Sequence, residues 1–148
     1  MAYGLEAGLA EFYRRMAGNT PDLEVSALLE KLAGMEDIHK DRLFGLYADL
    51  EGGAPDRREF EAGTVTDAME GGFTTETFIR KNRESMQTPS GVLEVAMMLE
   101  TQGMDLYLRY AEKSEDLRAR EVFYGLGEEE KVHMRLLGDL MDQKSAPQ

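Results

Sequence analysis

The sequence contains no cysteine, and only two of its 148 residues are histidines. Without cysteine, the chain can form neither disulfide bonds nor the thiolate sites that hold zinc or iron–sulfur clusters. The sequence also lacks a long apolar run, because Glu6 and Glu11 interrupt the apolar positions near its beginning. We therefore expect neither a signal peptide nor a membrane-spanning helix, and the cytoplasm is the expected location.

Positive charge is scarce as well. The 17 lysines and arginines are outnumbered by 29 aspartates and glutamates, which gives a formal net charge of −12. Such a chain has no basic surface to offset the charge of nucleic-acid phosphates or of anionic lipids. We expect neither a nucleic-acid partner nor a membrane partner. The excess of carboxylates leaves some of them available to face inward around cations.

Four segments of the chain carry apolar residues at helical spacing, and its length suits one domain. The expected helices span about 2–17, 21–50, 90–113 and 115–143, before a disordered tail at 144–148. Thr20 and Ser114 are the expected N-caps of the second and fourth helices, with Pro21 in the first turn of the second helix.

A longer stretch, 51–89, separates the second of these helices from the third. Two parts of this stretch, 64–70 and 75–84, have helical patterns. Short links within each helix pair and a long connection between the pairs predict an all-α fold. We expect a four-helix bundle with one crossover that contains short helices, in a single domain over residues 1–143.

The two predicted helix pairs, 2–50 and 90–143, repeat each other at a constant offset of 94 residues, the distance from Glu6 to Glu100. No gap is needed across either pair, so the chain reads as one helical hairpin used twice. The matching positions include Leu5/Leu99, Tyr13/Tyr107, Arg15/Arg109, Ala17/Ala111, Asp22/Asp116, Leu32/Leu126, Glu36/Glu130 and His39/His133.

Both histidines lie in an E-x-x-H motif, Glu36 to His39 and Glu130 to His133. Positions i and i+3 share one face of a helix, so the carboxylate and the imidazole can reach the same ion. A glutamate of the partner helix, Glu6 or Glu100, precedes each motif by 30 residues. One such motif is weak support for a metal site, whereas two in register within a repeat are strong.

Charge arithmetic favours two divalent ions among these six side chains. Four glutamates bring four negative charges, which two divalent cations would cancel. Without metal, the four carboxylates would repel one another in the core and resist ionisation. Oxygen-rich sites with one imidazole for each ion suit iron or manganese, and zinc can substitute.

The segments MLETQGMDLYLRYAEKSED and GEEEKVHMRLLGDLM resemble the rubrerythrin-type di-iron domain of the ferritin-like superfamily. The crossover segment MEGGFTTETFIRKN is similar to the form attached to rhodanese-type sulfurtransferases. The resemblance implies two iron ions per chain, with Glu36 and Glu130 bridging them. The metal ligands that the resemblance implies are Glu6, Glu36, His39, Glu100, Glu130 and His133.

The sequence departs from that family in two ways. Typical rubrerythrins carry a rubredoxin domain with four cysteines, so this chain would need an external, rubredoxin-like electron donor. Rubrerythrins also tend to have a further glutamate three residues beyond the ligand of the third helix. That position is Gly103 here, and we expect slower peroxide reduction than in a full rubrerythrin.

Two tyrosines, Tyr13 and Tyr107, lie seven residues after Glu6 and Glu100. We assign them as candidate catalytic residues, because each hydroxyl can hydrogen-bond a ligand carboxylate and orient it. The alternative is a core aromatic whose hydroxyl finds any partner. Glu129, next to a predicted ligand, is expected to point to another face of its helix.

Three functions remain open. The leading hypothesis is a di-iron redox enzyme that reduces dioxygen or hydrogen peroxide. The alternatives are a ferroxidase-type iron-handling protein and a metal-stabilised, non-enzymatic partner of a sulfurtransferase. A homodimer is also expected, because apolar side chains of the crossover have no obvious place in a four-helix core; they are Met69, Phe73, Phe78 and Ile79.

Overall fold

The computed structural model describes residues 1–64 and 68–146, and every element in this part of the chain is helical. The all-α class is therefore confirmed. Within the described residues, none of the helices combines the length and the apolarity that a membrane crossing requires. The long helices are α1 (Ala2–Asn19), α2 (Leu23–Glu51), α5 (Pro89–Lys113) and α6 (Leu117–Ser145), and the short ones are α3 (Arg57–Ala62), the 3₁₀ helix η1 (Glu70–Gly72) and α4 (Thr75–Lys81).

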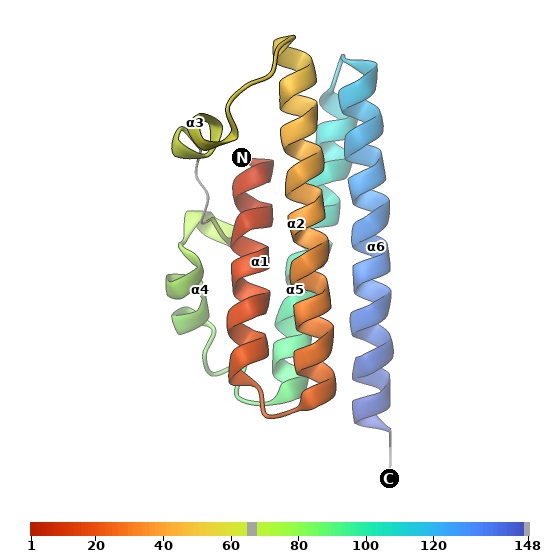
Figure 1. Cartoon of the computed structure of the whole chain (residues 1–148). Coiled ribbons are helices and arrows are strands. Elements are labelled where there is room, and N and C mark those ends of the chain that lie inside the picture. The colour runs from red at the N-terminus through yellow and green to blue at the C-terminus, as the bar shows by residue number, and fades with distance from the viewer. Residues whose placement is uncertain (65–67, 147–148) are drawn as a thin grey trace.

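The four long helices lie side by side in two pairs (Figure 1). α1 packs along α2, α5 packs along α6, and the two pairs meet chiefly where α2 packs against α6. Short loops join the members of each pair, which therefore run antiparallel. The segment between α2 and α5 passes beside α1 and returns the chain to the end where α1 and α2 join, so that α2 and α5 run in the same direction.

The second helix of each pair begins two residues later than the sequence predicts. Asp22 and Asp116 are the N-caps of α2 and α6, and their carboxylates accept hydrogen bonds from backbone N–H groups of the first turn. Thr20 and Ser114, the predicted N-caps, instead end the preceding helices in extended conformations. Because Pro21 disfavours helical geometry in the residue before it, Thr20 cannot continue α1. Both halves shift equally, so the offset of 94 is preserved.

The crossover contains short helices, although not all at the predicted positions. Asp56 caps α3 at 57–62, a segment not predicted to be helical. In place of the expected helix at 64–70 lies η1, which begins only at Glu70; residues 65–67 of that prediction lie outside the described residues. α4 starts at Thr75 as expected and ends three residues earlier.

The predicted tail is partly ordered. α6 continues through Ser145, and the Lys144 ammonium lies 2.8 Å from the carboxylate of Asp22 at the start of α2. Residues 147 and 148 of the predicted tail lie outside the described residues. The boundary expected at residue 143 is therefore too early.

The apolar side chains of the crossover are largely buried within the chain itself. Met69 and Phe78 belong to the main hydrophobic core, and Phe78 packs edge-on against Phe12 with 5.9 Å between the ring centroids. Ile79 packs partly buried against the same cluster, whereas Phe73 is 37% exposed. The argument for a dimer from these residues is therefore wrong for Met69 and Phe78, and the homodimer stays a prediction without that support.

A close backbone contact holds the crossover against α1. The N–H of Ala68 donates to the carbonyl of Gly4 at 3.4 Å, and the buried hydroxyl of Thr75 donates to the carbonyl of Gly8, also at 3.4 Å. A Cβ atom at Gly8 would overlap the carbonyl oxygen of Ala68. The absence of a side chain at position 8 therefore allows the crossover to cover α1 at the level of Glu6 and the first turns.

We predict that Gly8→Ala destabilises the chain by about 1–3 kcal/mol, because the added methyl group forces two backbones apart. Gly34→Ala is the matched control, since position 34 lies within α2 and a methyl group there would have no neighbouring atom within 4 Å; it should stabilise the fold by about 0.5–1 kcal/mol through helix propensity. Urea unfolding measures both changes. Equal effects of the two substitutions would contradict this account of the contact.

Candidate metal centre

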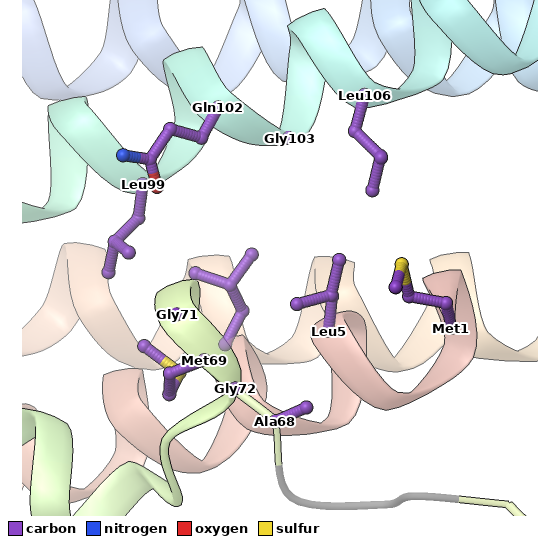
Figure 2. A pocket seen from close by; sticks show the side chains of 11 residues that line it. Met1, Leu5, Ala68, Met69, Gly71, Gly72, Leu99, Gln102, Gly103 and Leu106 are labelled. Atoms are coloured by element: carbon purple, nitrogen blue, oxygen red, sulfur yellow. The ribbon is translucent and has the colours of Figure 1, made fainter.

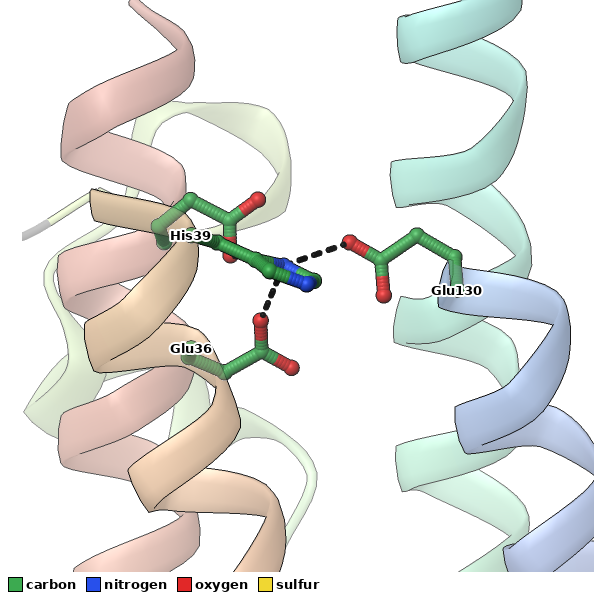
Figure 3. Close-up of side chains that lie close together, drawn as sticks. Glu36, His39 and Glu130 are labelled. Carbon is green, nitrogen blue, oxygen red and sulfur yellow. Dashed lines mark ion pairs between the residues drawn. The ribbon is translucent and has the colours of Figure 1, made fainter. Parts of the chain in front are cut away.

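The six predicted ligands lie at one level of the four long helices. α1 contributes Glu6 and α5 contributes Glu100, while each E-x-x-H motif projects from α2 or α6. All six side chains are at most 2% exposed. Figure 3 shows Glu36, His39 and Glu130 pointing toward one another across the space between the helices. The helical spacing therefore places the residues as the sequence predicts.

Two overlapping groups of candidate ligands result. One consists of Glu6, Glu36, His39 and Glu130, and the other of Glu36, Glu100, Glu130 and His133. Within each group, one ligand atom per residue lies within 4.8 Å of all the others. Glu36 and Glu130 belong to both groups, which is the arrangement that two carboxylates bridging a pair of ions require.

Both imidazoles present Nδ1 to the two shared carboxylates. Nδ1 of His39 lies 3.0 Å from Glu36 Oε2 and 3.3 Å from Glu130 Oε1. Nδ1 of His133 lies 2.9 Å from Glu130 Oε2 and 3.1 Å from Glu36 Oε1. The two rings stack with 5.1 Å between their centroids and 8° between their planes. The two imidazoles, from α2 and α6, thus each contact both shared carboxylates.

Most side-chain polar atoms of the six predicted ligands have no hydrogen-bond partner. Buried polar atoms in proteins are normally hydrogen-bonded, and an unpaired one costs about 1–3 kcal/mol. Cations bound between these groups would satisfy several such atoms together, and the oxygen-rich donor set suits hard or borderline metals. The buried atoms without a partner are Glu6 Oε2, both carboxylate oxygens of Glu36 and of Glu130, His39 Nδ1 and His133 Nε2.

The metal-free cluster holds protons strongly. Burial raises the pKa of Glu36 well above its usual range, and the charges of Glu6 and Glu100 raise it further. Burial likewise raises the pKa of Glu100 to about 7. For His133, burial opposes the charged form, but its carboxylate partners outweigh burial and raise its pKa to about 12. The same balance raises the pKa of His39, whose partners are Glu130, Glu36 and Glu6.

Glu130 departs from the expectation that all four carboxylates resist ionisation. Burial again opposes its charge, but the imidazoles of His133 and His39, whose Nδ1 atoms lie 2.9 and 3.3 Å from its oxygens, prevail and lower its pKa. The expectation from sequence considered only repulsion among glutamates and neglected imidazolium groups as partners. The metal-free cluster balances its charge partly with protonated histidines, and a metal ion must displace these protons before it binds.

The two buried tyrosines connect the halves of the site crosswise. The hydroxyl of Tyr13 on α1 donates to Glu100 on α5, and the hydroxyl of Tyr107 on α5 donates to Glu6 on α1. Burial and the neighbouring carboxylates raise the pKa of both phenols well above the usual value, so both stay protonated as donors. Each tyrosine therefore contacts a predicted ligand as expected, and its catalytic role stays a prediction.

The structure adds a contact that sequence reasoning missed. The carboxylate of Glu129 lies 2.8 Å from Nε2 of His39 and accepts a hydrogen bond from Arg42. Glu129 was expected to point to another face, but the close packing of α6 against α2 places it beside the back of the imidazole. A carboxylate in this position fixes the tautomer and orientation of a metal-binding histidine.

No such contact serves the other histidine within the described residues. The repeat offset maps Glu129 onto Met35 and Arg42 onto Leu136, which cannot provide the acceptor or its cationic partner. Nε2 of His133 accordingly has no hydrogen-bond partner. A comparison of the two halves for their differences, in addition to their matches, would have singled out Glu129 and Arg42.

Comparison of the chain with protein-family models, curated proteins and solved structures gave no match. The functional argument therefore depends on the geometry of this site and on the motifs of the sequence.

We predict that the metal-free chain is less stable at pH 8 than at pH 6. The raised pKa of Glu100 means that stability present at low pH is lost between about 4.5 and 7, as the unfolded chain alone releases this proton. The raised pKa of His133, from 6.5 to about 12, extends this loss above pH 6.5. The lowered pKa of Glu130 acts in the opposite sense only below about 4.5. Each retained proton costs up to about 1.4 kcal/mol per pH unit.

Thermal unfolding with a chelator, compared with unfolding of the Zn(II)-loaded chain, measures this effect. Metal requires deprotonated ligands, so its stabilisation should grow from pH 6 to pH 8. A melting temperature of the metal-free chain that rises over this range would contradict the assigned proton balance.

A second prediction concerns Glu129. Glu129→Ala leaves His39 without a fixed orientation and should weaken binding of the metal ion at His39 about 10–100-fold. Glu129→Gln keeps a hydrogen-bond acceptor and should weaken this binding less. Glu128→Ala is the matched control, because this neighbouring carboxylate is 64% exposed and pairs with Lys131. Competition with a chromophoric chelator gives the affinities. Identical affinities in the Ala variants of residues 128 and 129 would refute the role.

Proposed function

We propose that this chain is a rubrerythrin-like di-iron protein of the ferritin-like superfamily, which reduces hydrogen peroxide or dioxygen with electrons from a separate donor. The proposal is carried by the two buried groups that share Glu36 and Glu130. Each group offers three carboxylates and one imidazole, a donor set that suits iron, with manganese or zinc as possible substitutes.

The connectivity of the long helices supports the superfamily. Two antiparallel pairs are linked by one long connection, which is the topology of ferritin-like bundles rather than of simple up-and-down bundles. Proteins of that architecture with two metals place one glutamate on each of two helices and a Glu-x-x-His motif on each of the other two. Here α1 and α5 provide the single glutamates, and α2 and α6 provide the motifs.

Two bound ferrous ions would supply the two electrons that convert one peroxide molecule, with two protons, into water. The residues of the chain hold the reactants and shield the site. Tyr13 and Tyr107 keep their protons and hold Glu100 and Glu6 by hydrogen bonds, which limits how these carboxylates can turn. The burial of all six predicted ligands excludes bulk water from the reaction.

The electrons for repeated turnover must come from outside the chain. The chain has no cysteine to hold an iron–sulfur or rubredoxin-type centre. A rubredoxin-like protein is the proposed donor, and a rhodanese-type sulfurtransferase is a further proposed partner. We also propose that the chain acts as a homodimer.

Anaerobic reconstitution with Fe(II) tests this function. The chain should bind two ions, and one equivalent of peroxide should oxidise both, as followed by ferric absorption in the near ultraviolet. The double variant His39→Ala/His133→Ala and the variant Glu130→Ala should each bind fewer than one ion, while Glu128→Ala should bind two. Unchanged iron content in these variants would refute the ligands, and bound Fe(II) inert to both oxidants would refute the redox function.

Gly103 provides a prediction about rate. A Cβ atom at position 103 would lie 3.8 Å from the carboxylate of Glu130, so a longer acidic side chain there can reach the cluster. We expect Gly103→Glu to accelerate peroxide reduction on the order of tenfold, equivalent to about 1.4 kcal/mol in the barrier. Gly34→Glu, on an open face of α2, is the control. Stopped-flow rates that do not differ between the two variants would contradict the role of this position.

A further inference from the structure

A cavity of about 370 Å³ lies between α1 and α5, the two helices of the bundle that do not carry the histidines. Figure 2 shows side chains of α1 and α5 facing each other across it, with the segment 68–72 of the crossover along one wall. α1 and α5 approach each other far less than α2 and α6 do. The cavity is lined by Met1, Leu5, Leu9, Ala68, Met69, Gly71, Gly72, Leu99, Gln102, Gly103 and Leu106.

The cavity adjoins the candidate ligands directly. Leu5 and Leu99 line it and immediately precede Glu6 and Glu100 in their helices. Gly103 also lines it, and its missing side chain would touch the carboxylate of Glu130. Gly103 is therefore a residue of the lining that lies next to a shared carboxylate.

The two halves of the repeat differ at this point of the lining. The offset of 94 maps Gly103 onto Leu9, whose buried side chain occupies the corresponding position on α1. A leucine at both positions would make the two halves alike and would fill the approach to Glu130. The glycine on α5 thus leaves space beside Glu130, whereas Leu9 carries a side chain at the matching position on α1.

The lining indicates the chemistry of the molecule that fits. Among the described residues of the lining, none has a charged side chain, and Gln102 alone has a polar one. The described lining is thus almost wholly apolar, and the acidic chain as a whole disfavours an anionic group. Benzene fills an apolar cavity of about 150 Å³, so this cavity has room for a molecule roughly twice that size.

We propose that the cavity binds a neutral, apolar organic molecule, such as a medium-length alkyl chain with one uncharged polar end, with one end at Gly103 beside Glu130. The position near the predicted metal ligands would place this molecule beside the proposed metal centre, and that part of the inference rests on the proposed function. Binding itself does not, because the cavity is formed by the chain alone.

Fluorescence of the neutral probe N-phenyl-1-naphthylamine tests binding, with the full chain as isolated and after chelation of metals. The probe should bind one per chain and should be displaced by unbranched primary alkanols of six to twelve carbons. A carboxylate of the same chain length should displace it at least about tenfold less well, because moving a charged group from water into an apolar lining is costly. Failure of the probe and the alkanols to bind overturns the inference.

Leu106 provides the variants, since its side chain projects into the cavity (Figure 2). Leu106→Phe should fill the space and weaken alkanol binding at least about tenfold, whereas Leu106→Ala should shift the preference to longer alkanols. Leu23→Phe and Leu23→Ala are matched controls at a leucine that is 84% exposed. Equal binding in the variants at positions 106 and 23 would place the alkanol elsewhere and overturn the assignment.

Cobalt(II) loaded into the metal centre tests the placement beside Glu130. An alkanol bound with its end at Gly103 should change the visible absorption of the Co(II) form, and Leu106→Phe should abolish the change. An unaltered spectrum with alkanol bound would refute this placement. Failure of iron to bind would refute the proposed function while the probe still bound the cavity, so the two ideas fail separately.

Discussion

The burial of six ionisable side chains between four helices is the constraint on which the rest of the structure depends. Four carboxylates cannot all stay charged there without cations, because both desolvation and mutual repulsion oppose it. The histidines supply these cations as imidazolium groups in the metal-free chain, and metal ions would supply them otherwise. For Glu36, burial and the charges of Glu6 and Glu100 outweigh the imidazole contacts and raise the pKa, and burial raises that of Glu100. For Glu130 the imidazole contacts prevail, and its pKa falls.

The packing of the helices follows from the same cluster. Two stacked imidazoles are thin enough for α2 and α6 to pack together on their side. On the opposite side, α1 and α5 stay further apart, and the hydroxyls of Tyr13 and Tyr107 make hydrogen bonds between them. Because each tyrosine starts on one helix and reaches a carboxylate on the other, the two helices hold each other's ligands in place. The remaining space between them is the cavity that the crossover covers.

Much of this arrangement can be predicted from the sequence, because it depends on repetition and on helical period. The helical period predicts the four helices, and the constant offset between the halves identifies the six side chains that face inward. The errors have local causes. The helix starts were misplaced because Thr20 and Asp22 are both good N-caps, as are Ser114 and Asp116, and residue type alone does not decide between them. α3 was missed because six residues are too few for a periodic pattern.

The contacts that break the symmetry could not be predicted by matching the halves, because a repeat directs attention to what is shared. At the offset of 94, Glu129 corresponds to the apolar residue Met35, and Gly103 corresponds to Leu9. The first difference gives Nε2 of His39 a carboxylate partner, and the second leaves space beside Glu130 at the cavity.

A duplicated hairpin would by default give two equivalent ion positions. The Glu129 contact gives one position an oriented imidazole and leaves the other without such a contact. Two ions bound there would have unequal surroundings, so a molecule that reached them would meet two different partners. The asymmetry, rather than the repeat itself, is therefore where a specific reactivity of this chain would arise.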